Sequence, residues 1–325
     1  MTAQRSKDGG NKTVIAALAA NLGIAVTKFA AAAYTGSSSM LAEGIHSLVD
    51  TANQGFLLLG IHRAKKPADA AHPFGHGVEV YFWSFIVAIL IFALGAGFSI
   101  YEGVVRLLEP ASAAIEAPLV ALGVLAVALA MEGYSLSVAY SEFGAQRDPS
   151  AANGLLADVR AMKDPTIFVV LFEDSAACIG ILIAAAGIGL AWSTGIAEFD
   201  AIGSIVIGVV LAVTAVLLVV ETKGLLIGEA ASPAMVATIR DRVSERPEIV
   251  SVNEIRTLHL GPRDVLLTMS CDFKDDVLSQ DIEAAVSEIE QRVKRAYPIV
   301  RRLYIEVQSN AGHRLALAEE SAAAD

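Results

Sequence analysis

Cysteine is almost absent from this sequence, with two residues among 325. Cys178 lies inside an apolar run and Cys271 lies in the more polar C-terminal region, so we do not expect them to pair. No CxxC motif and no cluster of cysteine and histidine accompanies either of them. These absences exclude a disulfide framework and give no indication of a thiolate metal site.

Basic residues are also few, with 24 Lys and Arg against 35 Asp and Glu and a formal net charge of −11. A protein that binds nucleic acid needs a basic patch to neutralise phosphates, so we expect no nucleic-acid partner. The sequence contains no HExxH motif and no paired nucleophile and base. A metal-dependent intramembrane hydrolase would need such groups, and we therefore expect no enzymatic activity.

Apolar residues, by contrast, make up 54% of the chain and give it a mean hydropathy of +0.56. Six apolar runs are each long enough, at about 1.5 Å per residue, to cross a hydrocarbon core of about 30 Å as a helix. The runs are residues 13–34, 39–63, 78–107, 117–143, 166–192 and 200–222. The sequence therefore predicts an α-helical protein with six transmembrane helices in a lipid bilayer, within residues 13–227.

Lysine and arginine are concentrated in alternate connections of these runs. They precede the first run, follow the second, separate the fourth from the fifth and follow the sixth, while the other connections carry almost none. Because positively charged loops remain in the cytoplasm, we expect both termini to be cytoplasmic. Residues 1–12 are polar and lack the apolar core of a signal peptide, and we expect them to form a short N-terminal tail.

Beyond residue 227 the pattern becomes that of a small soluble domain. Residues 233–246 and 279–295 have apolar residues at helical spacing, whereas residues 249–259, 264–273 and 299–307 have the pattern of strands. Residues 228–309 are therefore predicted to form a cytoplasmic α+β domain of order α-β-β-α-β. Residues 310–325 are rich in Ala and Glu without clear periodicity, and we expect them to be disordered.

The second apolar run contains a polar stripe at helical spacing, formed by Glu43, His46, Ser47, Asp50, Asn53 and Gln54. His46 and Asp50 lie one helical turn apart on one face, a spacing at which two side chains can hold one ion. Ionisable groups at membrane depth are costly unless they are paired, hydrated or bound to an ion, so they indicate a functional site. The alternative is a buried hydrogen bond between His46 and Asp50 that only joins two helices.

The fifth run contains two adjacent carboxylates, Glu173 and Asp174. Adjacent helix positions point about 100° apart, so at most one of the two has the best direction toward a shared ion. Cys178 lies one turn beyond Asp174 and is a further candidate ligand, although a cysteine in an apolar span more often serves packing.

The connection after the second run contains Asp69, His72 and His76 around a glycine-rich turn. Intervals of three and four residues suit one metal ion, and the glycines let the backbone fold around it. Histidines in solvated loops are also common without any ligand, so the loop alone leaves both interpretations open.

Together these features resemble the cation diffusion facilitator family. The resemblance rests on the six runs, residues 37–50, the His72–His76 loop and the α-β-β-α-β tail, and it covers residues 13–308. Residues 171–177 look like the branch that includes a mitochondrial zinc transporter of animals. Family members are homodimeric transporters that export divalent cations, most often zinc, usually in exchange for protons. The resemblance therefore implies a homodimer, divalent metal ions as substrate, protons as counter-ion and no prosthetic group.

The resemblance also assigns a transport site between the second and fifth spans. His46 and Asp50 match the family's pair on the second span, and Asp174 matches a ligand on the fifth. The fifth span otherwise departs from the family pattern, which leaves Glu173 as the expected fourth ligand and Cys178 or water as alternatives.

Outside the membrane, Asp69, His72 and His76 match a second, loop-borne zinc site of bacterial members. The cytoplasmic metal site of the family is depleted here, because Asn253 and Glu306 stand where ligands such as histidine are usual. We therefore expect the tail to dimerise with little or no metal of its own.

One imidazole nitrogen and three carboxylate oxygens would bind Zn²⁺ and still allow its release. Histidine has a reference pKa of about 6.5, so protons entering from the far side can weaken metal binding at His46.

Mn, Fe, Co, Ni and Cd are alternative substrates, because oxygen ligands favour harder ions while histidine favours zinc. A transport-inactive scaffold or regulator is a second alternative. We expect a multi-pass protein of a bacterial inner membrane.

Overall fold

The computed structural model describes residues 21–108, 117–146 and 155–324, and the chain divides into two compact units. The first unit comprises Met1–Arg63 and Glu79–Lys223, and the second comprises Ala64–Val78 and Gly224–Asp325. The loop that carries Asp69, His72 and His76 thus belongs to the same compact unit as the C-terminal domain, whereas the sequence boundary at residue 227 assigned it to the membrane part.

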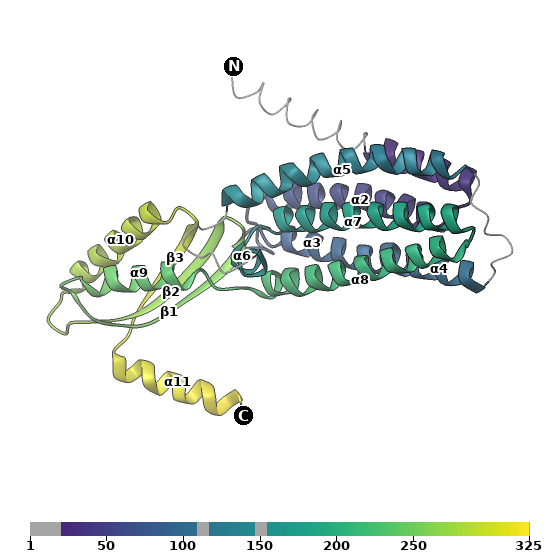
Figure 1. Cartoon of the computed structure of the whole chain (residues 1–325). Helices are drawn as coiled ribbons and strands as arrows, with labels where there is room; N and C mark the ends of the chain where they lie inside the picture. The colour runs from purple at the N-terminus through teal and green to yellow at the C-terminus, as the bar shows by residue number, and fades with distance from the viewer. Residues whose placement is uncertain (1–20, 109–116, 147–154, 325) are drawn as a thin grey trace, which may run out of the picture. The chain divides into compact units, whose positions relative to one another are not determined.

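The first unit is a bundle of long helices that lie alongside one another (Figure 1). A helical segment covers residues 21–35. It is followed along the chain by α2 (Ser38–Ala64), α3 (Glu79–Leu90), the π-helix η1 (Ile91–Ala96), α4 (Gly97–Leu108), α5 (Pro118–Gln146), the short helix α6 (Leu155–Ala161), α7 (Pro165–Thr194) and α8 (Glu198–Ile227).

In the part of the chain that the structure describes, four helices are long and apolar enough to cross a membrane. They are Glu79–Leu108, which joins α3, η1 and α4, then Pro118–Ala145, Pro165–Thr194 and Glu198–Ile227. These four correspond to the last four predicted spans. Helix α2 has 27 residues and is long enough, but its polar face makes it less apolar than these four helices. The first predicted span begins outside the described residues.

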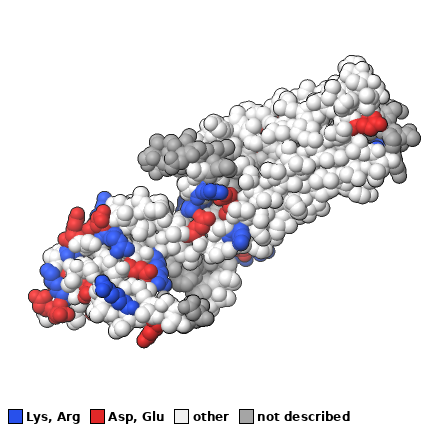
Figure 2. All heavy atoms as spheres, turned by 60° about the horizontal axis from the view of Figure 1, so that its bottom comes forward, with Lys and Arg blue, Asp and Glu red and all other residues white. Residues whose placement is uncertain are grey.

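The surface of the helical unit agrees with burial in lipid. Figure 2 shows a viewed face almost without charged side chains over most of this unit, while the C-terminal unit carries residues of both signs. In this unit, large apolar side chains such as Leu119, Val127 and Val213 are more than half exposed. A soluble protein rarely exposes so much apolar surface, so lipid is the natural partner of the helical unit.

Helix α7 has clear start and stop signals. Asp164 accepts a hydrogen bond from the backbone N–H of Thr166, and Pro165 occupies the first helical position, where a missing N–H costs nothing. Gly195 ends the helix with a φ of 73°, a left-handed conformation that glycine adopts without strain. These signals fix the register of α7, which carries Glu173 and Asp174.

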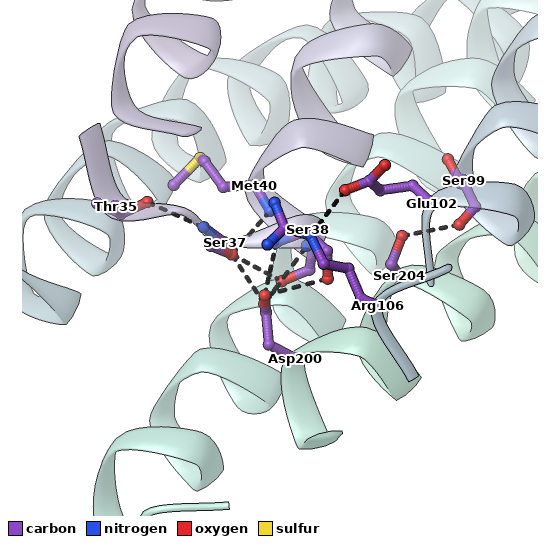
Figure 3. A network of polar contacts seen from close by, with 10 residues as sticks. Thr35, Ser37, Ser38, Met40, Ser99, Glu102, Arg106, Asp200 and Ser204 are labelled. Carbon is purple, nitrogen blue, oxygen red and sulfur yellow. Dashed lines mark hydrogen bonds and ion pairs between the residues drawn. The ribbon is translucent and has the colours of Figure 1, made fainter. Parts of the chain in front are cut away.

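Asp200 from the first turn of α8 caps the start of α2 (Figure 3). Its carboxylate accepts hydrogen bonds from the backbone N–H groups of Ser38, at 2.6 Å, and Ser39, at 3.4 Å. The hydroxyls of Ser37 and Ser38 donate at 2.8 and 3.1 Å, and the hydroxyl of Ser39 donates as well. A carboxylate at a helix start satisfies free N–H groups and opposes the helix dipole. One side chain therefore joins α2 to α8.

The C-terminal unit contains a three-stranded sheet, as the sequence predicted. Strands β1 (Ile249–Gly261) and β2 (Asp264–Phe273) are antiparallel, and β2 pairs in parallel with β3 (Val300–Val307). Helices α9 (Pro233–Ser244) and α10 (Ser279–Ala296) supply the apolar residues that bury one sheet face. Central strand β2 is the core of the domain, since alternate residues Val265, Leu267, Met269 and Cys271 are buried there.

The last helix differs from the prediction of a disordered tail. Residues Asn310–Ala324 form helix α11. Its start is fixed because Asp272 Oδ2 accepts the backbone N–H of Asn310 at 2.9 Å, and Asn310 Nδ2 donates to Asn253 Oδ1 at 3.0 Å. The segment is rich in Ala, Leu and Glu, which have high helix propensity. Propensity therefore accounts for α11 better than periodicity does, since its apolar residues form no regular stripe.

Replacing Asp200 with alanine should lower the thermal stability of the purified protein by several degrees. Loss of a helix N-cap costs about 0.5–2 kcal/mol, and 1 kcal/mol corresponds to about 2–4 °C in a domain of roughly this size. Glu198→Ala is the matched control, since Glu198 is an exposed acidic residue in the same turn. Equal unfolding temperatures for the two variants would show that the cap contributes no stability.

Candidate metal centre

One face of α2 carries the buried polar side chains that the sequence indicated. His46, Asp50 and Asn53 follow one another at intervals of four and three residues, so they share one side of the helix. His46 Nδ1 lies 3.4 Å from Asp50 Oδ1, and 1% of the histidine side chain and 16% of the aspartate side chain are exposed. The helix therefore presents an imidazole and a carboxylate to the bundle interior.

Several polar atoms on this face lack a hydrogen-bond partner among the described residues. They are both ring nitrogens of His46, Oδ1 of Asp50 and Oδ1 of Asn53. Buried polar atoms in proteins are nearly always paired, because leaving them unpaired costs free energy. Nitrogen and oxygen lone pairs without donors are the groups that a divalent cation can satisfy, so this face fits a metal-binding role.

Helix α7 directs its two adjacent carboxylates toward different neighbours. Asn53 Nδ2 on α2 donates to Glu173 Oε1 at 2.6 Å, whereas Ser135 Oγ on α5 donates to Asp174 Oδ2 at 2.7 Å. Glu173 and Asp174 are both buried, with 5% and 7% exposed. Glu173 is thus the α7 carboxylate bonded to the helix of His46 and Asp50, and Asp174 faces α5.

Other ionisable side chains lie near Asp50. Glu173, Glu132 and Asp174 are close enough to interact with its carboxyl group, as is Lys28. Ionising neighbouring carboxyl groups together in a medium of low dielectric constant is costly without a positive charge near them. A cation at Asp50 would offset this cost.

Lys28 forms the one ion pair in the described helical unit in which both side chains are fully buried. Its Nζ donates to Glu43 Oε2 at 2.9 Å and to Ser47 Oγ at 2.8 Å. The second oxygen of Glu43 has no hydrogen-bond partner in the described part of the chain and lies where a Cβ atom at Gly180 would collide with it. Glycine at position 180 therefore permits the close approach of α7 to this ion pair.

The membrane residues do not form a closed metal cage. Among the described residues, one group of three or more His, Cys, Asp and Glu side chains has all its ligand atoms within 4.8 Å of one another, and it is the loop group Asp69, His72 and His76. His46, Asp50, Glu173 and Asp174 are more widely spread, and Cys178, a free cysteine one turn beyond Asp174, belongs to no such group.

The loop residues are close together in this structure. Asp69 Oδ1 lies 3.3 Å from His72 Nδ1, and Asp69 Oδ2 lies 3.5 Å from His76 Nε2. The two imidazole rings lie with their centroids 4.3 Å apart. Two imidazoles and a carboxylate make a donor set suited to zinc, with a fourth position left for water or another group.

Backbone groups prepare Asp69 for this role. The N–H groups of His72 and Ala71 donate to Asp69 Oδ1 at 2.7 and 2.9 Å. The hydrogen bond from the His72 backbone is the main reason why the pKa of the Asp69 carboxyl lies below its ordinary value. The carboxylate therefore stays ionised to lower pH, and an ionised carboxylate is the form that binds metal.

The loop is also attached to the C-terminal domain. Arg302 Nη2 on β3 donates to the backbone carbonyl of Phe74 at 2.9 Å, and the guanidinium lies 5.4 Å from the centre of the Phe74 ring. The same arginine donates from Nη1 to both carboxylate oxygens of Asp264, at 2.9 and 3.0 Å. Arg302 thus fixes the loop conformation that keeps Asp69, His72 and His76 together.

The structure gathers some of the predicted residues and adds others. The helical spacing in the sequence groups His46 with Asp50 and places Asn53 in the same polar stripe, but it does not predict the hydrogen bond from Asn53 to Glu173. No sequence signal pointed to Ser135 as the partner of Asp174, because that contact joins two helices distant in the chain. The pairing of Lys28 with Glu43 was also not predicted.

Comparisons with known proteins agree on one family. A model described as the cation efflux transmembrane domain matches residues 14–227. The proton-coupled zinc antiporter SLC30A9, mitochondrial, of Homo sapiens is 35% identical over 291 residues, which are 87% of this chain and 50% of that protein. Metal tolerance protein C4 of Arabidopsis thaliana is 30% identical over 272 residues, which are 83% of this chain and 58% of that protein.

The cation-efflux pump FieF of Salmonella arizonae is 26% identical over 288 residues, which are 89% of both chains. The chain spans about half the length of the human relative that it matches.

The variant His72→Ala/His76→Ala should bind fewer zinc ions than the unaltered protein, by about one per protomer, because it leaves Asp69 as the loop's remaining donor. Zinc content after dialysis at fixed free zinc, measured by atomic absorption, tests this. The control is His62→Ala, which removes an exposed histidine at the end of α2. An unchanged zinc content in the double variant would contradict the loop site.

Proposed function

The chain belongs to the cation efflux family, and from this premise we propose that it exports Zn²⁺ from the cytoplasm in exchange for protons. Members of this family are transporters and not enzymes. The observation that carries the proposal is the buried face of α2, where His46 and Asp50 lie beside Glu173 with unpaired nitrogen and oxygen atoms.

We assign the transport site to His46, Asp50, Glu173 and Asp174. Zn²⁺ takes four ligands at about 2.0–2.2 Å when these are imidazole nitrogens and carboxylate oxygens. The four side chains lie on two helices, and Glu173 and Asp174 diverge toward α2 and α5. An ion would draw α2 and α7 together, and parting of these helices would release it. Such motion supports alternating access to the two sides of the membrane.

Proton exchange follows from the chemistry of the ligands. Imidazole and carboxylate must be deprotonated to bind metal, so each bound ion displaces protons and each entering proton weakens metal binding. Acid on the release side therefore promotes discharge of zinc, and the proton gradient supplies the driving force. The name of the human relative, a proton-coupled zinc antiporter, is in keeping with this proposal.

A metal other than zinc is the second candidate substrate. Three of the four proposed ligands are carboxylates, and Asn53 adds an unpaired amide oxygen nearby. Oxygen donors favour harder ions such as Mn²⁺, whereas His46 favours zinc and its neighbours in the transition series. A transport-inactive regulator is the remaining alternative, and flux measurements separate it from both transporters.

We further propose a homodimer with six membrane spans per protomer, located in a bacterial inner membrane with both termini in the cytoplasm. The alternation of charged connections supports this orientation. The C-terminal domain, residues 228–309, would be the dimerisation domain, and Asp69, His72 and His76 would bind a further zinc ion on the cytoplasmic side.

His46→Ala and Asp50→Ala should each reduce zinc uptake into inverted vesicles by more than about tenfold, since loss of even a partner of a metal ligand costs that much. Leu48→Ala, which removes a half-exposed apolar side chain from the same helix, is the control and should keep normal flux. Size-exclusion profiles show whether the variants fold. Normal flux in both folded variants would remove these residues from the site.

An outward-directed proton gradient, acid inside inverted vesicles, should accelerate zinc uptake, and zinc addition should drive protons outward. A lumenal pH dye and a zinc-sensitive dye record the two fluxes together. Vesicles with Asp50→Ala protein measure the leak, and an ionophore that collapses the gradient should abolish the acceleration. Zinc uptake that ignores the gradient and moves no protons would indicate a uniporter.

A further inference from the structure

We propose that Asn53 is a positioning residue that sets which divalent cation the transport site prefers, an inference that rests on the proposed function. Asn53 lies on the face of α2 that carries His46 and Asp50 and is fully buried. Its amide nitrogen donates to Glu173 Oε1 at 2.6 Å. Among the described residues, this hydrogen bond joins Glu173 of α7 to the helix that carries His46.

The hydrogen bond constrains how Glu173 can bind an ion. With Oε1 held by the Asn53 amide, Oε2 is the oxygen left to bind metal, so Glu173 acts through one oxygen. A one-oxygen carboxylate suits a small, four-coordinate ion such as Zn²⁺. Larger ions with more ligands accept carboxylates through both oxygens. Asn53 thus favours the small ion by withholding one oxygen of Glu173.

The other end of the amide supports the same inference. Once Nδ2 donates to Glu173, Oδ1 is an acceptor, and it is buried without a hydrogen-bond partner among the described residues. A buried carbonyl oxygen without a donor costs free energy that a cation or its bound water can recover. Asn53 is therefore oriented by one end and available to the ion at the other.

Side chains that orient a metal ligand have a large effect on metal affinity. Removing a hydrogen bond that orients a ligand typically costs about 10–100-fold in metal affinity. Ser135, which donates to Asp174, has no second buried polar atom left unpaired. This contrast singles out Asn53 among the two partners of the α7 carboxylates.

The test uses the full chain carrying His72→Ala/His76→Ala, so that zinc titration reports on the membrane site. Asn53→Leu keeps the branched shape and the number of heavy atoms of the side chain and removes both polar ends, and Asn53→Ser restores a short donor. Gln54→Leu removes the neighbouring amide and is the matched control. Isothermal titration with Zn²⁺ and Cd²⁺ gives the affinities, and vesicle uptake gives KM and kcat for each ion.

We expect Asn53→Leu to weaken Zn²⁺ binding by about tenfold or more, to raise the KM for Zn²⁺ in step, and to weaken Cd²⁺ binding less. Asn53→Ser should recover part of the zinc affinity, and Gln54→Leu should bind like the parent. In a Glu173→Ala background the Asn53→Leu substitution should have a much smaller effect on Zn²⁺ affinity, because Asn53 acts mainly by positioning Glu173.

The outcomes separate failure of the positioning role of Asn53 from failure of the proposed transport function. Equal Zn²⁺ and Cd²⁺ losses that persist without Glu173, accompanied by a lower unfolding temperature, would make Asn53 merely structural and overturn the inference. If Asn53→Leu behaves like Gln54→Leu while the parent transports zinc, the inference fails and the proposed function stands. If the parent neither binds nor transports any of the tested ions, the proposed function itself fails.

Discussion

An ionised side chain inside a membrane bundle needs an opposite charge, hydrogen-bond donors or an ion, because hydrocarbon solvates it poorly. The helical unit meets this requirement in two ways. Lys28 and Glu43 neutralise each other at 2.9 Å, with Ser47 as a third partner. His46 and Asp50, further along α2, keep buried atoms without a hydrogen-bond partner among the described residues, and a cation could satisfy these atoms.

These two arrangements depend on the same helix-to-helix contacts. Gly180 lets the Glu43 carboxylate lie directly against α7, and Asn53 bonds to Glu173 on the same helix. At its start, α2 is joined to α8 through Asp200. Helix α2 is therefore held at its first turn by one helix and along its length by another. A change in the polar face of α2 would therefore alter its packing against both α7 and α8.

Much of the fold follows from simple patterns in the sequence, while the site depends on contacts between distant segments. Long apolar runs identify α5, α7 and α8, and alternation identifies β2, because each pattern is local. Helical spacing likewise brings His46 to Asp50. The direction of Glu173 could not be predicted, since it depends on Asn53, 120 residues away. Helix α11 departs from the expected disorder because its residues have high helix propensity without a periodic apolar face.

The place of the loop 64–78 likewise depends on a contact between distant segments. Its sequence predicts a group of metal ligands, but nothing in it indicates that Arg302 on β3 would hold Phe74. The loop is nevertheless continuous with α2, so the helix with His46 and Asp50 leads directly into a segment that packs with the C-terminal domain.

Adjacent carboxylates on α7 impose a further constraint. A pair spaced by four residues points one way, but Glu173 and Asp174 diverge by about 100°. One helix can then serve α2 and α5 together, and the number of oxygens near His46 depends on how α7 lies against each. A site assembled this way is complete in some helix arrangements and incomplete in others. That property suits a transporter, which must release its ion as readily as it binds it.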